Sequence, residues 1–83
     1  MTATRAEIFT ALCELLQPFN SAGVALSLTT DISTDLNIDS VTVMDFVMEV
    51  EDHFNIEIAL NVLSETRTLD DLVSVVDARV NRS

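Results

Sequence analysis

Residues 36–58, "LNIDSVTVMDFVMEVEDHFNIEI", constrain the fold of this chain most strongly. Apolar side chains recur there at helical spacing, acidic residues occupy many of the positions between them, and no Lys or Arg interrupts the pattern. The spacing predicts a helix from Ser40 to about Phe54. Asp39 is its expected N-cap, because a carboxylate there accepts the free N–H groups of the first turn, and Asn55 suits the helix end. The expected core stripe is Val43, Phe46 or Val47, Val50 and Phe54.

The N-terminal part of the chain predicts a second long helix, from Arg5 to about Phe19. Thr4 and Glu7 have the spacing of a capping box, and the expected buried face is Ile8, Leu12, Leu15, Leu16 and Phe19. Residues 20–38 are rich in turn formers and predict a long loop with a short helical turn near Ile32–Leu36. The side chains expected to hold this loop to the core are Val24, Leu26, Leu28, Ile32, Leu36 and Ile38.

The C-terminal part predicts a short helix around Leu60–Ser64 and a last helix from Leu69 to about Val80, with Thr68 as N-cap. The expected buried face of the last helix is Leu69, Leu72, Val73, Val76 and Val80. The 83 residues include one Pro and one Gly, which agrees with a mostly helical chain. We therefore expect an all-α fold: a small four-helix bundle of three long helices and one short one, with a long loop between the first and second helices, forming a single domain over 1–83.

Acidic residues dominate the charge of the chain. Fourteen acids against four bases give a net charge of −10, and eleven of the acids lie between Arg5 and Arg67 with no Lys or Arg among them. Such a surface repels phosphate backbones, so we expect no nucleic-acid binding. It attracts basic protein surfaces instead.

The sequence also indicates where the chain works. It contains no run of about 18 apolar residues that could span a membrane and no signal-peptide pattern at its N-terminus. A single cysteine cannot form an internal disulfide, which fits a reducing compartment. We expect a cytoplasmic monomer.

Neither metal binding nor catalysis finds a complete set of residues. Asp35, Asn37 and Asp39 have the opening spacing of a calcium loop, but the sixth and twelfth positions hold Ser40 and Phe46 instead of Gly and Glu, so we predict no metal site. The single histidine, His53, lies about 20 Å along the same predicted helix from Ser40, too far to activate its hydroxyl. Cys13 is interpreted as a small buried apolar residue. We therefore predict no catalytic residues and no enzymatic activity.

The predicted helix 40–54 carries a second apolar stripe beside its core stripe. Val41, Met44 and Met48 form it, and the acids that flank it are Asp45, Glu49, Glu51 and Asp52. An apolar strip between acids is typical of a helix that docks into a basic groove with an apolar centre. For Ser40, the residues alone leave two interpretations open: a cap-region residue that bonds the backbone, or a hydroxyl presented for attachment.

Residues 35–58 resemble the acyl carrier proteins. The hallmark of that family is a D-L-G-x-D-S-L-type stretch, followed by an acidic, apolar helix with an E-E-F-like end and then E-I. The matching residues here are Asp35, Leu36, Asp39, Ser40, Val41, Glu51, Asp52, Phe54, Glu57 and Ile58. The length of the chain, its first helix, its long loop and its final helix opening at "TLDDLV" agree as well, so the resemblance covers nearly the whole chain.

The resemblance implies a function for Ser40. It would carry 4′-phosphopantetheine, transferred from coenzyme A by a phosphopantetheinyl transferase, with Asp39 and Val41 supporting the motif. The thiol of that group would hold acyl intermediates of fatty-acid, specialised-lipid or polyketide synthesis as thioesters. Acyl-ACP synthetase, ketosynthase and acyltransferase-type enzymes with basic patches would dock on Met44, Asp45, Met48, Glu49, Glu51 and Asp52. The alternatives are a peptidyl or aminoacyl carrier, and an unmodified module of the same shape that docks a basic partner.

Three positions depart from the family pattern. Asn37 replaces the glycine before Asp39–Ser40, although Asn tolerates left-handed backbone angles. Thr42 stands where an acid is common, and Ala59 stands where a proline is common. These departures leave the attachment motif intact and favour a specialised carrier over the housekeeping fatty-acid carrier.

Overall fold

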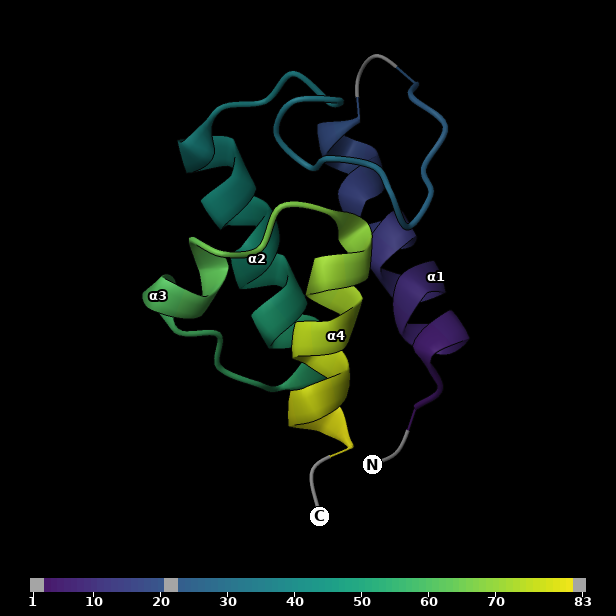
Figure 1. Ribbon diagram of the computed structural model, residues 1–83, viewed down its shortest axis with the longest axis vertical. Coiled ribbons are helices and arrows are strands. Elements are labelled where there is room, and N and C mark those ends of the chain that lie inside the picture. The colour runs from purple at the N-terminus through teal and green to yellow at the C-terminus, as the bar shows by residue number, and fades with distance from the viewer. Residues whose placement is uncertain (1–2, 21–22, 82–83) are drawn as a thin grey trace.

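The computed structural model describes residues 3–20 and 23–81. Its elements, in order, are α1 (Arg5–Leu16), the 3₁₀ turn η1 (Gln17–Phe19), α2 (Ser40–Phe54), α3 (Leu60–Leu63) and α4 (Leu69–Val80). Three long helices lie side by side, α1 running opposite to α2 and α4, and the short α3 stands beside α2 (Figure 1). The loop between α1 and α2 covers the end of the bundle where α2 and α4 begin. The predicted all-α four-helix fold is confirmed.

Helix α2 begins and ends at the residues that the sequence predicts. Asp39 is the N-cap, and its Oδ1 accepts the Thr42 backbone N–H at 2.9 Å. Asn55 closes the helix in a left-handed conformation with φ 55°, and its N–H donates to the Glu51 carbonyl. Both ends are therefore fixed by local side-chain and backbone chemistry.

Helix α1 has the predicted start and an earlier end. The Thr4 hydroxyl accepts the Glu7 N–H at 3.1 Å, and a Glu7 carboxylate oxygen accepts the Thr4 N–H at 2.9 Å, which completes the capping box. The α-helix stops at Leu16, and the expected last turn is the 3₁₀ turn η1. Pro18 causes this change, because it has no N–H to continue the α-helical ladder.

Helices α3 and α4 match their predicted positions closely. Helix α3 ends at Leu63, one residue before the expected Ser64. Helix α4 spans the predicted range, and Thr68 and Asp71 form a second capping box at its start. The Asp71 carboxylate thus fixes the start of α4 together with Thr68.

The core contains most of the side chains that periodicity predicts. Its buried members are Ile8, Leu12, Leu16, Ile32, Leu36, Phe46, Val47, Val50, Phe54, Ile58, Leu69, Leu72, Val73 and Val76. Six predicted core residues pack against it while only partly buried: Leu15, Phe19, Val24, Leu26, Ile38 and Val80. Val43, predicted for the α2 stripe, is also partly buried. The prediction for Leu28 is wrong, because its side chain is exposed.

Backbone hydrogen bonds hold the long loop against the start of α4. The Asp70 N–H donates to the Leu28 carbonyl at 2.9 Å, and the Ile32 N–H donates to the Arg67 carbonyl at 3.0 Å. These bonds fix the backbone of Leu28 while its side chain faces outward, which explains why an apolar residue in this loop is exposed. The turn expected near Ile32–Leu36 exists as a single helical hydrogen bond from the Asp35 N–H to the Asp31 carbonyl, and no helix continues from it.

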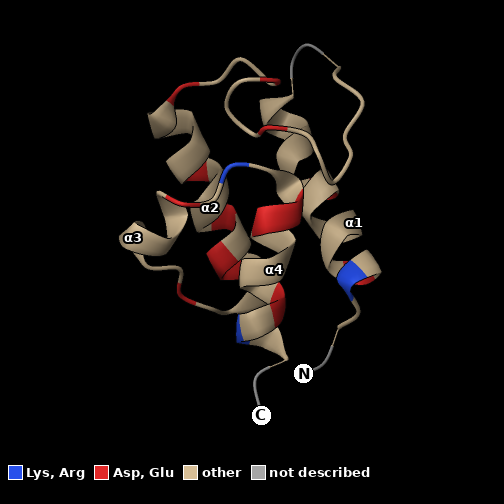
Figure 2. Cartoon of the chain, viewed as in Figure 1, with Lys and Arg blue, Asp and Glu red and all other residues tan. Residues whose placement is uncertain are grey.

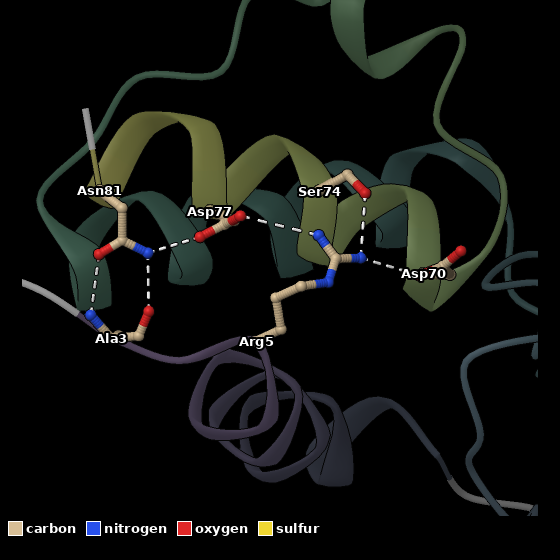
Figure 3. A network of polar contacts seen from close by, with 6 residues as sticks. All are labelled: Ala3, Arg5, Asp70, Ser74, Asp77 and Asn81. Atoms are coloured by element: carbon tan, nitrogen blue, oxygen red, sulfur yellow. Dashed lines mark hydrogen bonds and ion pairs between the residues drawn. The ribbon is translucent and has the colours of Figure 1, made fainter. Parts of the chain in front are cut away.

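A polar network joins the two ends of the described chain (Figure 3). Arg5 contacts Asp70 at 3.0 Å and Asp77 at 3.7 Å, and it donates to the Ser74 hydroxyl at 3.2 Å. Asn81 exchanges two hydrogen bonds with the backbone of Ala3, at 2.9 and 2.7 Å. The network fixes the start of α1 along α4, although exposed ion pairs of this kind each contribute little to stability.

Backbone N–H groups lower the pKa of four carboxylates at turns and helix starts. The largest cause in each case is a backbone hydrogen bond: to Glu7 from Thr4, to Asp31 from Thr34, to Asp39 from Thr42 and to Asp71 from Arg67. A carboxylate whose pKa is lower in the folded chain stabilises the fold above its ordinary pKa, and that contribution is lost as the pH falls through the lowered value.

Stability is therefore expected to pass through a maximum at mildly acidic pH. Between neutral pH and about pH 5, protonation relieves repulsion within a chain of net charge −10 and raises stability. As the pH then falls below the ordinary carboxylate range of about pH 4 and through the lowered pKa values, the stabilisation from the four bonded carboxylates is lost and stability falls. Urea unfolding followed by circular dichroism across this range tests the curve, with Asp71→Asn showing a weaker fall in acid than the wild type. A steady rise to the lowest pH would contradict the role of the bonded carboxylates.

Candidate functional site

Ser40 is the first residue of α2, and it is exposed. The capping hydrogen bond to Thr42 comes from the Asp39 carboxylate. None of the hydrogen bonds found within residues 3–20 and 23–81 uses the Ser40 hydroxyl oxygen. The neighbouring Asp39 thus does the capping, and the Ser40 hydroxyl is left available.

The turn before Ser40 contains a left-handed residue at the position where the family pattern has glycine. Asn37 adopts φ 53°, in the left-handed region that glycine favours and asparagine tolerates. The Ile38 N–H donates to the Ser33 carbonyl at 3.0 Å, and the Asn37 N–H donates to the Thr34 carbonyl at 3.3 Å. This turn leads into α2 so that the exposed Ser40 is its first residue. The backbone N–H groups at a helix N-terminus favour a phosphate.

A surface cavity of about 590 Å³ opens beside Ser40. It lies among the loop before α2, helices α2 and α3, and the segment that leads into α4. Its lining residues are Asp31, Ile32, Ser33, Thr34, Ile38, Ser40, Val43, Met44, Leu60, Leu63, Ser64, Thr66 and Arg67. Two stretches of the chain, residues 31–44 and 60–67, therefore meet next to the exposed hydroxyl.

Four of the six docking residues predicted on α2 line one shallow cavity, and Met44 and Glu51 do not. Val41 and Met48 are 66% and 60% exposed, and Met44 is exposed beside them. Acidic residues lie along α2 and α4, and basic residues are few (Figure 2). This shallow cavity has a volume of about 350 Å³, and it is lined by Phe19 of η1 and by Asp45, Met48, Glu49 and Asp52. Glu51 is partly buried, and its Oε2 accepts the Ile58 N–H at 2.8 Å, so its carboxylate also holds the loop after α2.

The remaining chemically active side chains lie apart from Ser40. The His53 ring packs edge-on against Phe54, with centroids 4.8 Å apart, near the end of α2. Cys13 is partly buried on α1, and burial raises the pKa of its thiol. Among the residues that the structure describes, no three His, Cys, Asp or Glu side chains gather closely enough to hold a metal ion. Nor does any helix in the described ranges have the length and apolarity needed to cross a membrane.

Most residues that line the cavity were not identified from the sequence as site residues, and Leu60 and Arg67 are two of them. Leu60, at the start of α3, is 69% exposed and lines the cavity together with Met44. Arg67 lines it from the segment before α4. The sequence of α3, "LNVL", has three apolar residues and no charged one. This is the signal in the sequence that the short helix contributes to a site.

Comparison with known proteins defines the class of this chain. Residues 7–76 match the family described as "Phosphopantetheine attachment site". The chain is 30% identical to the solved acyl carrier protein from Enterococcus faecalis, covering 98% of this chain and 100% of that one with a TM-score of 0.68. The chain therefore belongs to the acyl carrier protein family, as its resemblance predicts.

Two curated relatives carry the same name. A probable acyl carrier protein of Caulobacter vibrioides is 39% identical over 46 residues, which are 55% of this chain and 54% of the relative. An acyl carrier protein of Coprothermobacter proteolyticus is 27% identical over 55 residues, covering 66% of this chain and 67% of the relative. The match thus spans about half the length of the Caulobacter protein.

The cofactor of this family is 4′-phosphopantetheine, and the start of α2 fits such a group. The helix N-terminus offers unpaired N–H groups to a phosphate, as helix starts generally do. The cavity of about 590 Å³ gives room for a flexible arm beside the exposed hydroxyl.

Proposed function

We propose that this chain is an acyl carrier whose Ser40 hydroxyl bears the 4′-phosphopantetheine group. The observation that carries the proposal is the exposed Ser40 hydroxyl at the start of α2. It lies beside a cavity, and the Asp39 carboxylate caps the helix in its place. The matched family region, residues 7–76, includes this position. His53 lies near the opposite end of α2 from Ser40, which supports a carrier that other enzymes modify and that performs no catalysis itself.

The attachment chemistry needs only what Ser40 provides. With a phosphopantetheinyl transferase as catalyst, the hydroxyl loses its proton and its oxygen bonds to the phosphorus of coenzyme A as the pyrophosphate bond breaks and the nucleotide bisphosphate leaves. The N–H groups of the first turn of α2 then stabilise the phosphodiester charge. When bound, the group supplies a thiol that holds acyl intermediates of fatty-acid, specialised-lipid or polyketide synthesis as thioesters.

The surface of α2 supports docking to enzymes with basic patches. Val41, Met44 and Met48 give an exposed apolar strip, and methionine side chains adapt readily to different partners. Asp45, Glu49 and Asp52 lie on the same helix and attract basic side chains, which speeds association and sets orientation. The proposed partners are the transferase and acyl-handling enzymes of the synthetase, ketosynthase and acyltransferase types.

Acyl loading tests the carrier function directly. The chain is incubated with coenzyme A and a broad-specificity phosphopantetheinyl transferase, and the product is then supplied to an acyl-ACP synthetase with a fatty acid and ATP. We expect intact mass to rise first by one phosphopantetheine and then by one acyl group, with the acyl mass alone removed by hydroxylamine. A folded chain that gains neither mass would favour the unmodified docking module instead.

Charge reversal on α2 tests the docking surface. Asp45→Lys with Glu49→Lys is expected to slow modification by the transferase about tenfold at low salt, because the acids that attract basic partners are replaced by repelling charges. The matched control is Glu14→Lys with Glu65→Lys, which makes the same change in net charge at exposed positions outside α2. Equal rates for the two double variants would show that α2 does not guide docking.

A further inference from the structure

A second cavity lies between α1, the loop before α2 and α4. Its volume is about 500 Å³, and its lining is almost entirely apolar. The lining includes Arg5, Ala6, Phe9, Leu26, Leu28 and Val73. None of its residues belongs to α2 or α3, and none lines the cavity beside Ser40. Helices α1 and α3 stand on opposite sides of the bundle (Figure 1). This cavity, the α1–α4 groove, is therefore separate from the surfaces described above.

Leu28 gives the groove an exposed apolar side chain. Among the described residues, five large apolar side chains are strongly exposed, and Leu28, at 45%, is the one outside α2 and α3. Its carbonyl accepts the Asp70 N–H at 2.9 Å, and the N–H of the preceding Ser27 donates to the Thr30 hydroxyl at 2.8 Å. The loop thus presents Leu28 to solvent from a backbone that hydrogen bonds hold in place.

Acidic residues of α4 lie beside the groove. Asp70, Val73 and Asp77 are spaced three and four residues apart, so they share one face of α4. Arg5 lines the groove and contacts both carboxylates, at 3.0 Å to Asp70 and at 3.7 Å to Asp77 (Figure 3). One guanidinium therefore meets two carboxylates, and the Asp70 side chain is still 54% exposed. An apolar patch with charged residues around it is typical of a protein interaction site.

Charge distinguishes among the possible occupants. A second copy of this chain would bring another net charge of −10 and would be repelled. A fatty-acid carboxylate or an anionic lipid surface would be repelled in the same way. A protein segment with Lys or Arg beside apolar side chains matches both the apolar lining and the acids of α4. Amphipathic helices bind apolar grooves with side chains arranged in this way.

We propose that the α1–α4 groove is a second docking surface, and that its occupant is an amphipathic helix of a partner protein with Lys or Arg beside its apolar face. The apolar side chains of that helix cover Leu28 and Phe9, and a basic side chain pairs with Asp70. Because no residue of the groove comes from α2, a partner bound here leaves Ser40 and the α2 surface accessible. One protein can thus hold the chain while another acts on it.

The test uses synthetic peptides as probes of the full, unmodified chain. The first peptide is an amphipathic helix of about 14 residues built from Leu and Lys, with the leucines along one face. The second has Glu in place of every Lys, and the third has the composition of the first in an order that leaves no apolar face. Each is titrated into isotope-labelled protein and followed by NMR. The amide signals of residues 5–9, 26–28 and Val73 report on the groove, and those of residues 41–52 report on α2.

Two leucine variants form the matched pair. Leu28→Gln removes the exposed apolar side chain of the groove, and Leu60→Gln makes the same change at an exposed leucine of α3 outside the groove. We expect the Leu–Lys peptide to shift the groove signals saturably in the wild type and in Leu60→Gln. Its affinity for the groove should be about tenfold weaker in Leu28→Gln, because the contact with a buried leucine is lost. The other two peptides should leave the groove signals unshifted.

Several outcomes would overturn the proposal. Shifts confined to α2 in the wild type, no shifts at all, or equal groove binding in the two leucine variants would show that the groove is not a docking surface. Equal binding of the Glu peptide, or of the peptide without an apolar face, would show that the occupant is not a basic amphipathic helix. Groove signals that move with protein concentration alone would assign the groove to a second copy. Since no step requires the arm on Ser40, each of these outcomes leaves the carrier function untouched.

Discussion

Ser40→Ala is expected to abolish addition of phosphopantetheine while leaving the free energy of unfolding within about 1 kcal/mol of the wild type. The loss is complete because the substitution removes the oxygen that bonds to phosphorus. The effect on stability is small because Asp39 caps α2 and the Ser40 hydroxyl makes no hydrogen bond within the described residues. Intact mass after incubation with coenzyme A and a transferase measures the first effect, and urea unfolding measures the second.

Ser33→Ala is the matched control for that variant. Ser33 also presents an exposed hydroxyl to the cavity beside Ser40, but it lies in the loop and not at the start of α2. We expect this control to gain the arm as the wild type does. If the Ser40→Ala variant still gained the arm, the attachment would have to be on another hydroxyl. If that variant lost several kcal/mol, the description of the Ser40 hydroxyl as structurally free would be contradicted.

Phe46→Ala is expected to destabilise the fold by about 3–5 kcal/mol, the usual effect of truncating a buried aromatic side chain. Phe46 is fully buried on α2, and its ring meets that of Phe19 edge-on with centroids 6.0 Å apart. Phe46 thus packs α2 against η1, the turn that follows α1. Since small domains have only about 5–15 kcal/mol of stability in total, the variant should lose a large part of it.

Urea unfolding followed by circular dichroism measures this loss. Met48→Ala is the control, because Met48 is an exposed apolar residue further along the same helix, and its truncation should change stability by about 0.5 kcal/mol or less. A change below about 1 kcal/mol in Phe46→Ala would mean that the core can close around the missing ring and that this contact does not organise the bundle.

The sequence predicts α2 accurately because both of its ends carry chemical signals. Asp39 and Asn55 fix the boundaries through a side-chain cap and a left-handed turn, and the apolar spacing between them sets the buried face. The end of α1 is less certain from sequence, since Pro18 allows a 3₁₀ turn as readily as a sharp stop. The prediction is thus most accurate where a local interaction decides the conformation.

Long-range contacts explain the rest. Leu28 is exposed because backbone hydrogen bonds hold the loop against the start of α4. The apolar residues alternate along this loop, and that pattern does not show which of their side chains face solvent. Arg5 pairs with Asp70 and Asp77, residues more than sixty positions away. The motif around Ser40 is visible in the sequence, but the cavity beside it is not, because residues 31–44 and 60–67 meet there only in the folded chain.

Locating the modification within the chain tests the central claim most directly. The wild-type protein is incubated with coenzyme A and a broad-specificity phosphopantetheinyl transferase, digested, and examined by fragmentation mass spectrometry of the peptide that contains residues 36–58. The account predicts one phosphopantetheine per chain, on Ser40. A folded protein that gains no arm, or one that gains it on another hydroxyl, would contradict the account.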